Sequence, residues 1–196
     1  MQITTQQVSA LRAKTGLPLM EVKQALIEAS GDEEKAILIL RKKGLSKSEK
    51  RADKETANGL IDSYLHNGRV GVLVEVLCET DFVAKNTDFK NFAHELSLQI
   101  AATNPKYISS DEISSEDLKK EKEIYAAEAK SSSKPQNVIE KIVAGKLEIY
   151  FSEVCLLSQQ YFREPKKKIS DLLNGIVIKT GEKIVISRFV RFELNC

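Results

Sequence analysis

The residues best suited to chemistry are Thr80, Asp81, Phe82 and Val83, which directly follow the apolar run Val70 to Cys78. That run is typical of a β-strand, and the residues after it are typical of a helix start. An acid and a large aromatic side chain therefore come together at a strand end, where a rigid scaffold often presents functional side chains. A phenylalanine beside an aspartate is better suited to insertion into another molecule than to acid–base catalysis. We therefore predict a contact site here.

The same residues also have a purely structural interpretation. Thr80 or Asp81 would cap the following helix, and Phe82 would staple that helix to the core. The two interpretations are compatible, because a capped and rigid helix start also presents its side chains well.

Among the elements that surround this motif, three short amphipathic helices are predicted within residues 4–44. Pro18 suits the first turn of the second helix, where its missing N–H costs nothing. Gly31 ends that helix and Asp32 caps the third, with Gly44 predicted as the C-cap of the third helix.

We predict three parts along the chain. Residues 1–45 resemble a three-helix module of the ubiquitin-associated type, which exposes an apolar patch. Residues 46–56 form a polar linker with an excess of basic residues, and no aromatic residues lie between the charges, as nucleic-acid stacking would need. Residues 57–196 form the core domain.

The core is predicted to be α+β, with about three antiparallel strands packed with helices. Asn67-Gly68 separates two β-rich runs and is a strong hairpin signal, because both turn positions need positive φ. The β-rich segment 184–194 is predicted to pair with this hairpin. Helical patterns lie between them, over residues 89–100, 115–130, 138–157 and 169–179.

The composition indicates no preference for nucleic acid or membranes. The 196 residues carry a formal net charge of +2, which is too small to attract either. No apolar run approaches the ~20 residues of a membrane span. Cys78, Cys155 and Cys196 are far apart and odd in number, which is typical of free thiols in a reducing compartment. We expect a soluble cytoplasmic protein, with the plastid stroma as the alternative location.

The sequence does not indicate an enzyme. The phosphate-binding patterns G-x-x-x-x-G-K-[ST] and G-x-G-x-x-G are both absent from it. His66 and His94 are the two histidines, and neither has a cysteine or histidine at metal-ligand spacing. We therefore expect a binding or regulatory protein that needs no cofactor and no metal.

Several motifs, in the same order along nearly the whole chain, resemble the elongation factor Ts family of bacteria and organelles. The segment Thr80 to Asn86 and the strand before it resemble the heart of the family's core. The amino-terminal module and the final strand match at Leu11-Arg12-Ala13-Lys14-Thr15-Gly16, Leu40-Arg41-Lys42-Lys43-Gly44 and Arg188-Phe189-Val190-Arg191-Phe192-Glu193. The family's later helices are resembled by Val154-Cys155-Leu156-Leu157 and Pro165-Lys166-Lys167-Lys168.

This resemblance implies a guanine-nucleotide exchange factor that binds elongation factor Tu in its GDP form. In the family, an Asp-Phe pair after this strand enters elongation factor Tu near its bound magnesium. The pair helps to dislodge the metal and disturbs the phosphate-binding loop, so that GDP leaves. Carried over by motif, that role falls to Asp81 and Phe82, with Thr80 and Val83 shaping the turn.

The amino-terminal module of the family docks on the nucleotide-binding domain, which implies a second contact through Leu11, Arg12 and Met20. The longer family members also carry a second core half and an inserted helical hairpin before the final strand. Here only about twenty residues separate Arg163 from Ile184, so we expect both parts to be largely absent.

A single core half leaves a sheet with free edges, which predicts a homodimer. The final strand is the expected participant, with Ile184, Ile186, Val190 and Phe192 predicted to share one face. Cys196 follows this strand, and a free thiol is favoured there over an intermolecular disulfide. The competing function is an adaptor whose three-helix module binds ubiquitin-like proteins or nascent chains.

Overall fold

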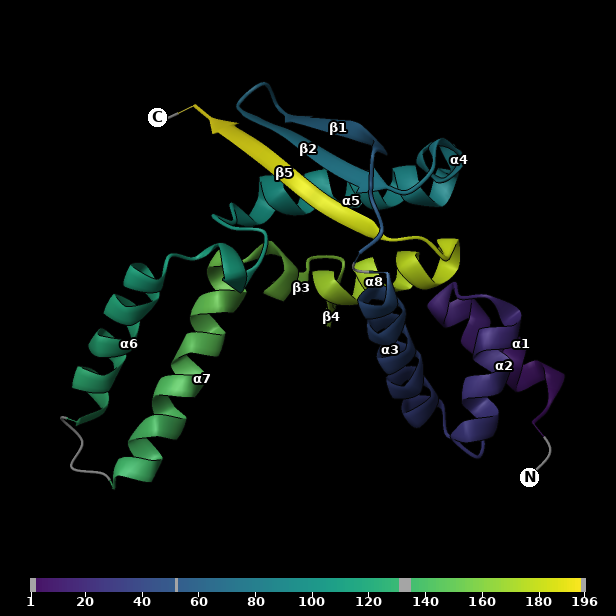
Figure 1. The fold of residues 1–196 in the computed structure, drawn as a ribbon, viewed down its shortest axis with the longest axis horizontal. Helices are drawn as coiled ribbons and strands as arrows, with labels where there is room; N and C mark the ends of the chain where they lie inside the picture. Colours follow the sequence, from purple (N-terminus) through teal and green to yellow (C-terminus); the bar gives the residue numbers. More distant parts are fainter. Residues whose placement is uncertain (1–2, 52, 131–134, 195–196) are drawn as a thin grey trace. The chain divides into compact units, whose positions relative to one another are not determined.

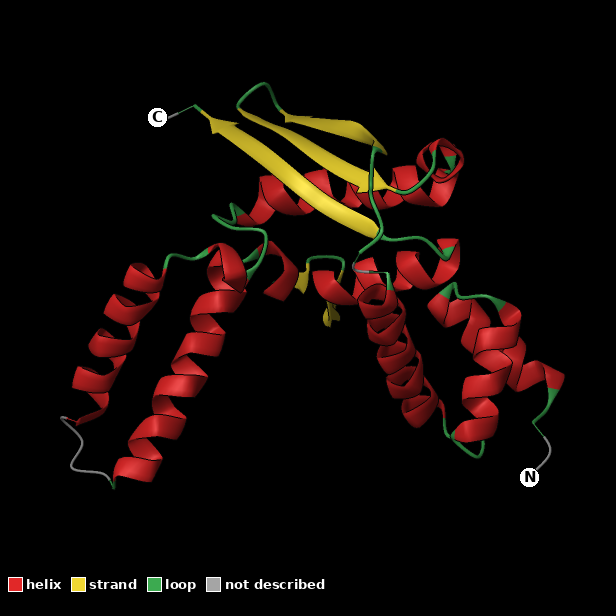
Figure 2. Ribbon diagram, viewed as in Figure 1, coloured by secondary structure: helices red, strands yellow, loops and turns green. Residues whose placement is uncertain are grey.

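The computed structural model describes residues 3–51, 53–130 and 135–194, which form two compact units. The first unit contains the described residues of Met1–Leu98 and Ser170–Cys196, and the second unit is Gln99–Ile169. The first unit mixes helices and strands, whereas the second is mostly helical (Figure 2).

A three-stranded antiparallel sheet lies in the first unit, in the order β1 (Asn58–His66), β2 (Val70–Cys78) and β5 (Ile184–Glu193) (Figure 1). The α+β class and the pairing of the final strand with the hairpin are therefore confirmed. Asn67 and Gly68 form the hairpin turn with φ values of 50° and 68°, as the Asn-Gly signal predicts.

The inner face of the sheet is buried against α5 (Thr87–Thr103), which runs along it in Figure 1. Val74 and Val76 of β2, with Phe89 and Leu96 of α5, are all 0% exposed. This close packing gives the end of β2 a firm base from which the next residues project.

A β-bulge in β5 changes which residues share a face of the sheet. The register between β2 and β5 shifts next to Glu75. Ile184 and Ile186 lie on the buried inner face, whereas Val190 and Phe192 lie on the outer face and are 38% and 70% exposed. The prediction that these four residues share one face is therefore wrong, because the extra residue of a bulge breaks the period of two.

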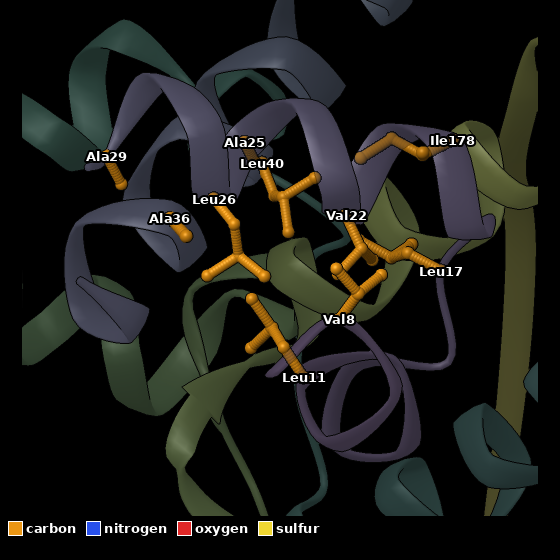
Figure 3. Close-up of a cluster of buried hydrophobic side chains, with 10 residues drawn as sticks. All are labelled: Val8, Leu11, Leu17, Val22, Ala25, Leu26, Ala29, Ala36, Leu40 and Ile178. Carbon is orange, nitrogen blue, oxygen red and sulfur yellow. The ribbon is translucent and has the colours of Figure 1, made fainter. Parts of the chain in front are cut away.

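The amino-terminal helices α1 (Thr5–Thr15), α2 (Leu19–Glu28) and α3 (Glu33–Lys50) pack around a common apolar core, shown in Figure 3. Its buried side chains are Val8, Leu11, Leu17, Val22, Ala25, Leu26, Ala29, Ala36, Leu40 and Ile178. The last of these belongs to α8 (Ile169–Thr180), so the three helices do not complete this core alone. As predicted, Asp32 caps α3, where its side chain accepts a 3.0 Å hydrogen bond from the Lys35 N–H.

Gly44 lies inside α3, so the prediction that it ends the helix is wrong. The helix continues to Lys50, into the segment predicted to be a linker. A Cβ at Gly44 would lie 2.9 Å from Cδ1 of Ile178 and 3.1 Å from Cβ of Asn174, so glycine is needed for the close approach of α3 and α8. The division of the chain at residues 45 and 56 stays a prediction.

The second unit contains a pair of neighbouring helices, α6 and α7, followed by a short β-hairpin. Their bounds are Ser115–Lys130 for α6, Gln136–Val154 for α7, Gln160–Tyr161 for β3 and Glu164–Lys168 for β4, with short 3₁₀ turns at Ser110–Glu112 and Leu156–Ser158. The sequence interpretation missed this hairpin, because Pro165 to Lys168 resembled a helical part of the family. The two helices agree with the helical patterns predicted over residues 115–130 and 138–157. No helix among the described residues is long and apolar enough to cross a membrane.

Candidate partner-contact site

The residues from Thr80 to Val83, which we call the tip, begin the short helix α4 (Asp81–Lys85) directly after β2. Thr80 has extended backbone angles and its hydroxyl accepts a 3.3 Å hydrogen bond from the Val83 N–H, so it is the N-cap of α4. Val83 is only 5% exposed and anchors the helix to the core. The predicted capping role of Thr80 is confirmed.

Phe82 is 78% exposed, so most of its side chain lies in solvent. The alternative interpretation, in which it staples the helix to the core, is therefore wrong. An exposed phenylalanine on a capped and anchored helix is an unusual use of a large apolar side chain, because burying such a ring is normally favourable. This geometry favours a residue held ready for contact with another molecule.

Asp81 is exposed beside Phe82, with its carboxylate 2.7 Å from the Lys85 ammonium group. The hydrogen bond and the charge of Lys85 hold the pKa of Asp81 below its usual value. The tip therefore presents an ionised carboxylate and an aromatic ring side by side at neutral pH.

Two acidic residues that sequence reasoning missed brace the tip from behind. Glu182 accepts hydrogen bonds from the Thr80 N–H at 3.0 Å and from the Thr80 hydroxyl at 2.7 Å. Glu79 accepts a 2.6 Å bond from the Lys183 N–H and two bonds, at 2.7 and 2.8 Å, from the Arg51 guanidinium. Burial opposes the charge of Glu79, but these donors outweigh it and hold its pKa below the usual value.

Cys78 and Cys155 are both buried, and both are free thiols, as predicted. Burial is the main cause that raises the pKa of Cys78 to about 11, and the nearby negative charge of Glu182 adds to the effect. A protonated thiol is a poor nucleophile, so Cys78 has a packing role. Its sulfur also donates a 3.1 Å hydrogen bond to the Thr80 carbonyl. Cys196 lies outside the described residues, so its predicted free thiol stays a prediction.

The three residues predicted for a second contact lie in different environments. Met20 is 69% exposed on α2, and Arg12 is exposed on α1. Leu11 is 0% exposed and belongs to the core shown in Figure 3. A direct contact through the Leu11 side chain is therefore ruled out unless the module opens, because a fully buried side chain cannot reach a partner.

A polar cluster between β1 and α5 does not have the geometry of a nucleophilic site. Asp62 accepts a 2.6 Å bond from the Ser97 hydroxyl and lies 3.2 Å from Nδ1 of His94. A nucleophile requires the histidine next to the serine, whereas here the aspartate lies between them. Within the described part of the chain, no group of His, Cys, Asp and Glu side chains is arranged to hold a metal ion.

Comparisons with known proteins agree with the motifs. The family described as Elongation factor TS matches residues 42–195. A protein named Elongation factor Ts from Thermoanaerobacter sp. (strain X514) is 54% identical over 192 residues, which cover 97% of this chain and 94% of the relative. Proteins of the same name from Thermodesulfovibrio yellowstonii and Thermotoga petrophila are 51% and 49% identical, and each alignment covers 100% of this chain and 98% of the relative. The chain therefore belongs to the elongation factor Ts family.

Proposed function

We propose that this chain is the guanine-nucleotide exchange factor of elongation factor Tu, which it binds in the GDP form. The observation that carries the proposal is the tip, where Phe82 is 78% exposed next to an ionised Asp81 on a capped helix. On binding, the Phe82 ring enters the partner near its magnesium, and the Asp81 carboxylate adds negative charge close to the metal and the phosphates.

The physical basis of exchange is thermodynamic linkage. If the chain weakens GDP binding by some factor, GDP weakens binding of the chain by the same factor. Magnesium supplies much of the charge that holds a diphosphate, so a tip that displaces the metal acts on the strongest local interaction. No covalent bond is made or broken, so the chain is an exchange factor rather than an enzyme and needs no cofactor of its own.

A second contact through the amino-terminal module would set the affinity of the complex. Met20 and Arg12 are exposed, and the neighbouring Leu19 and Ile27 are 48% and 55% exposed. Together they present an apolar surface on α2 with a positive charge on α1. Exposed apolar residues grouped on one helix are suited to binding a protein partner.

We also propose that the chain works as a homodimer that pairs the outer faces of its sheets. Leu65, Leu73 and Phe192 are 69%, 48% and 70% exposed on this face. A two-fold partner covers such a surface with a copy of itself. Light scattering at micromolar concentration should give twice the chain mass of 21.9 kDa. A Phe192→Glu variant should give the monomer mass, and a monomeric wild-type chain would overturn the dimer.

The reported relatives come from bacteria, which favours the bacterial cytoplasm over the plastid stroma. The adaptor alternative is less favoured, because it gives no role to the exposed Phe82. We propose no nucleic-acid or membrane partner, because the net charge is only +2.

The test is stopped-flow release of a fluorescent GDP from elongation factor Tu in the presence of magnesium. The chain should accelerate release by orders of magnitude, and the acceleration should saturate with its concentration. Release at the intrinsic rate at every concentration would overturn the proposed function.

A further inference from the structure

Glu182 lies in the short connection between α8 and β5, directly after Gly181, and its carboxylate reaches the start of α4. One carboxylate oxygen accepts the Thr80 N–H at 3.0 Å, and the other accepts the Thr80 hydroxyl hydrogen at 2.7 Å. Thr80 therefore donates to both carboxylate oxygens of Glu182. The two bonds fix the backbone and the side chain of Thr80 together. Hydrogen bonds to an ionised group are stronger than those between neutral groups.

These bonds set the direction of the Thr80 hydroxyl. Because its hydrogen points to Glu182, its oxygen lone pairs are available to accept the Val83 N–H at 3.3 Å. Glu182 thereby completes the N-cap on which α4 depends. A helix of five residues is too short to be stable by itself, so its orientation depends on such local bonds.

The brace is reciprocal. Glu182 bonds to Thr80 of the tip, while Glu79, the residue before Thr80, accepts a 2.6 Å bond from the N–H of Lys183, the residue after Glu182. Arg51 holds the Glu79 carboxylate through two further bonds. The side chain of Glu182 thus bonds to the segment that begins α4, and the side chain of Glu79 bonds to the segment that begins β5.

We propose that Glu182 is a positioning residue for nucleotide exchange, which holds the tip in the orientation that inserts Phe82. This inference rests on the proposed function, in which Phe82 acts on the bound magnesium. A tip that is already ordered spends less binding energy on becoming ordered and has more available to displace the metal. Glu182 itself does not need to touch elongation factor Tu.

The test compares Glu182→Ala and Glu182→Gln with the wild-type chain in stopped-flow GDP release. Two parameters are measured: the maximal release rate at saturating chain, and the chain concentration that gives half of it. Glu182→Ala should lower the maximal rate by about tenfold, the order expected for a lost bond to a charged group. The half-saturating concentration should change by less than about twofold, because the module's contact is untouched. The maximal rate of Glu182→Gln should lie between those of Glu182→Ala and the wild type, since glutamine keeps one acceptor oxygen.

Two controls separate positioning from general damage. Glu112→Ala removes a carboxylate that accepts a 2.7 Å bond from the Ile108 N–H in the second unit, and should leave both parameters unchanged. In a Phe82→Ala background, adding Glu182→Ala should reduce the maximal rate little further, because the residue that Glu182 positions is already gone.

A wild-type maximal rate for Glu182→Ala would overturn the inference. So would a full tenfold further loss in the Phe82→Ala background, because Glu182 would then act independently of the tip. Normal exchange by Phe82→Ala alone would overturn the proposed role of the tip and, with it, this inference. Slow exchange by Phe82→Ala together with normal exchange by Glu182→Ala would overturn only the role of Glu182.

Discussion

Replacing Phe82 with alanine should separate function from stability, and Phe89 provides the matched control. Phe82 is 78% exposed, so only about a fifth of its ~200 Å² is removed from water, which corresponds to about 1 kcal/mol of stability at ~25 cal/mol per Å². Phe89 is 0% exposed, so its truncation should cost about 3–5 kcal/mol. The two substitutions are chemically identical and differ only in where the ring lies.

For exchange activity, Phe82→Ala should be the more damaging of the two substitutions. An aromatic side chain at the centre of an interface contributes ~2 kcal/mol or more, which corresponds to at least about a thirtyfold loss. Phe82→Ala should therefore slow stimulated GDP release by about this factor while urea unfolding stays close to wild type. Phe89→Ala, assayed at a temperature at which the variant is still folded, should retain most of its exchange activity. A loss of several kcal/mol for Phe82→Ala, or unchanged exchange, would refute the assignment of Phe82 as an exposed probe.

Three further predictions test other parts of the structure. Met20→Ala should raise the half-saturating concentration by about fivefold with an unchanged maximal rate, whereas Leu11→Ala should cost about 2–5 kcal/mol in urea unfolding because Leu11 is fully buried. Gly145→Ala should raise stability by about 0.5–1 kcal/mol, since its Cβ would meet nothing within 4 Å, and Gly44→Ala should not, since its Cβ would lie 2.9 Å from a side chain of α8. Because the folded state lowers the pKa of Glu79 from its ordinary 4.5, its contribution to stability should be present above that pH and lost as the pH falls through the lower folded value. Urea unfolding from neutral to acid pH should then show a shallower loss for Glu79→Gln than for wild type, and equal losses would contradict the assignment.

The parts of the fold that were predictable have local signals. Asn67-Gly68 indicates its own turn, because few other residues accept positive φ at two successive positions. Thr80 is a good N-cap by residue type, and the structure confirms it. Such signals depend on residues close together in the sequence, so a single sequence is enough to predict these features.

The parts that were missed depend on contacts between distant residues. Gly44 has the residue type of a helix end, and only the position of Ile178 reveals that it permits a close approach instead. Glu182 and Thr80 are 102 residues apart, so no periodic pattern could have joined them. Leu11 and Met20 are both apolar residues on short helices, and their opposite exposure depends on how the helices pack.

The central claim is that the tip causes nucleotide release. The most direct measurement is the rate of fluorescent GDP release from elongation factor Tu, with either the wild type or the Asp81→Ala/Phe82→Ala variant at saturating concentration. Binding of each protein to elongation factor Tu is measured separately. We predict that both chains bind and that the wild type accelerates release by orders of magnitude. The variant should leave the release rate close to its intrinsic value. Equal acceleration by the two chains would contradict the claim.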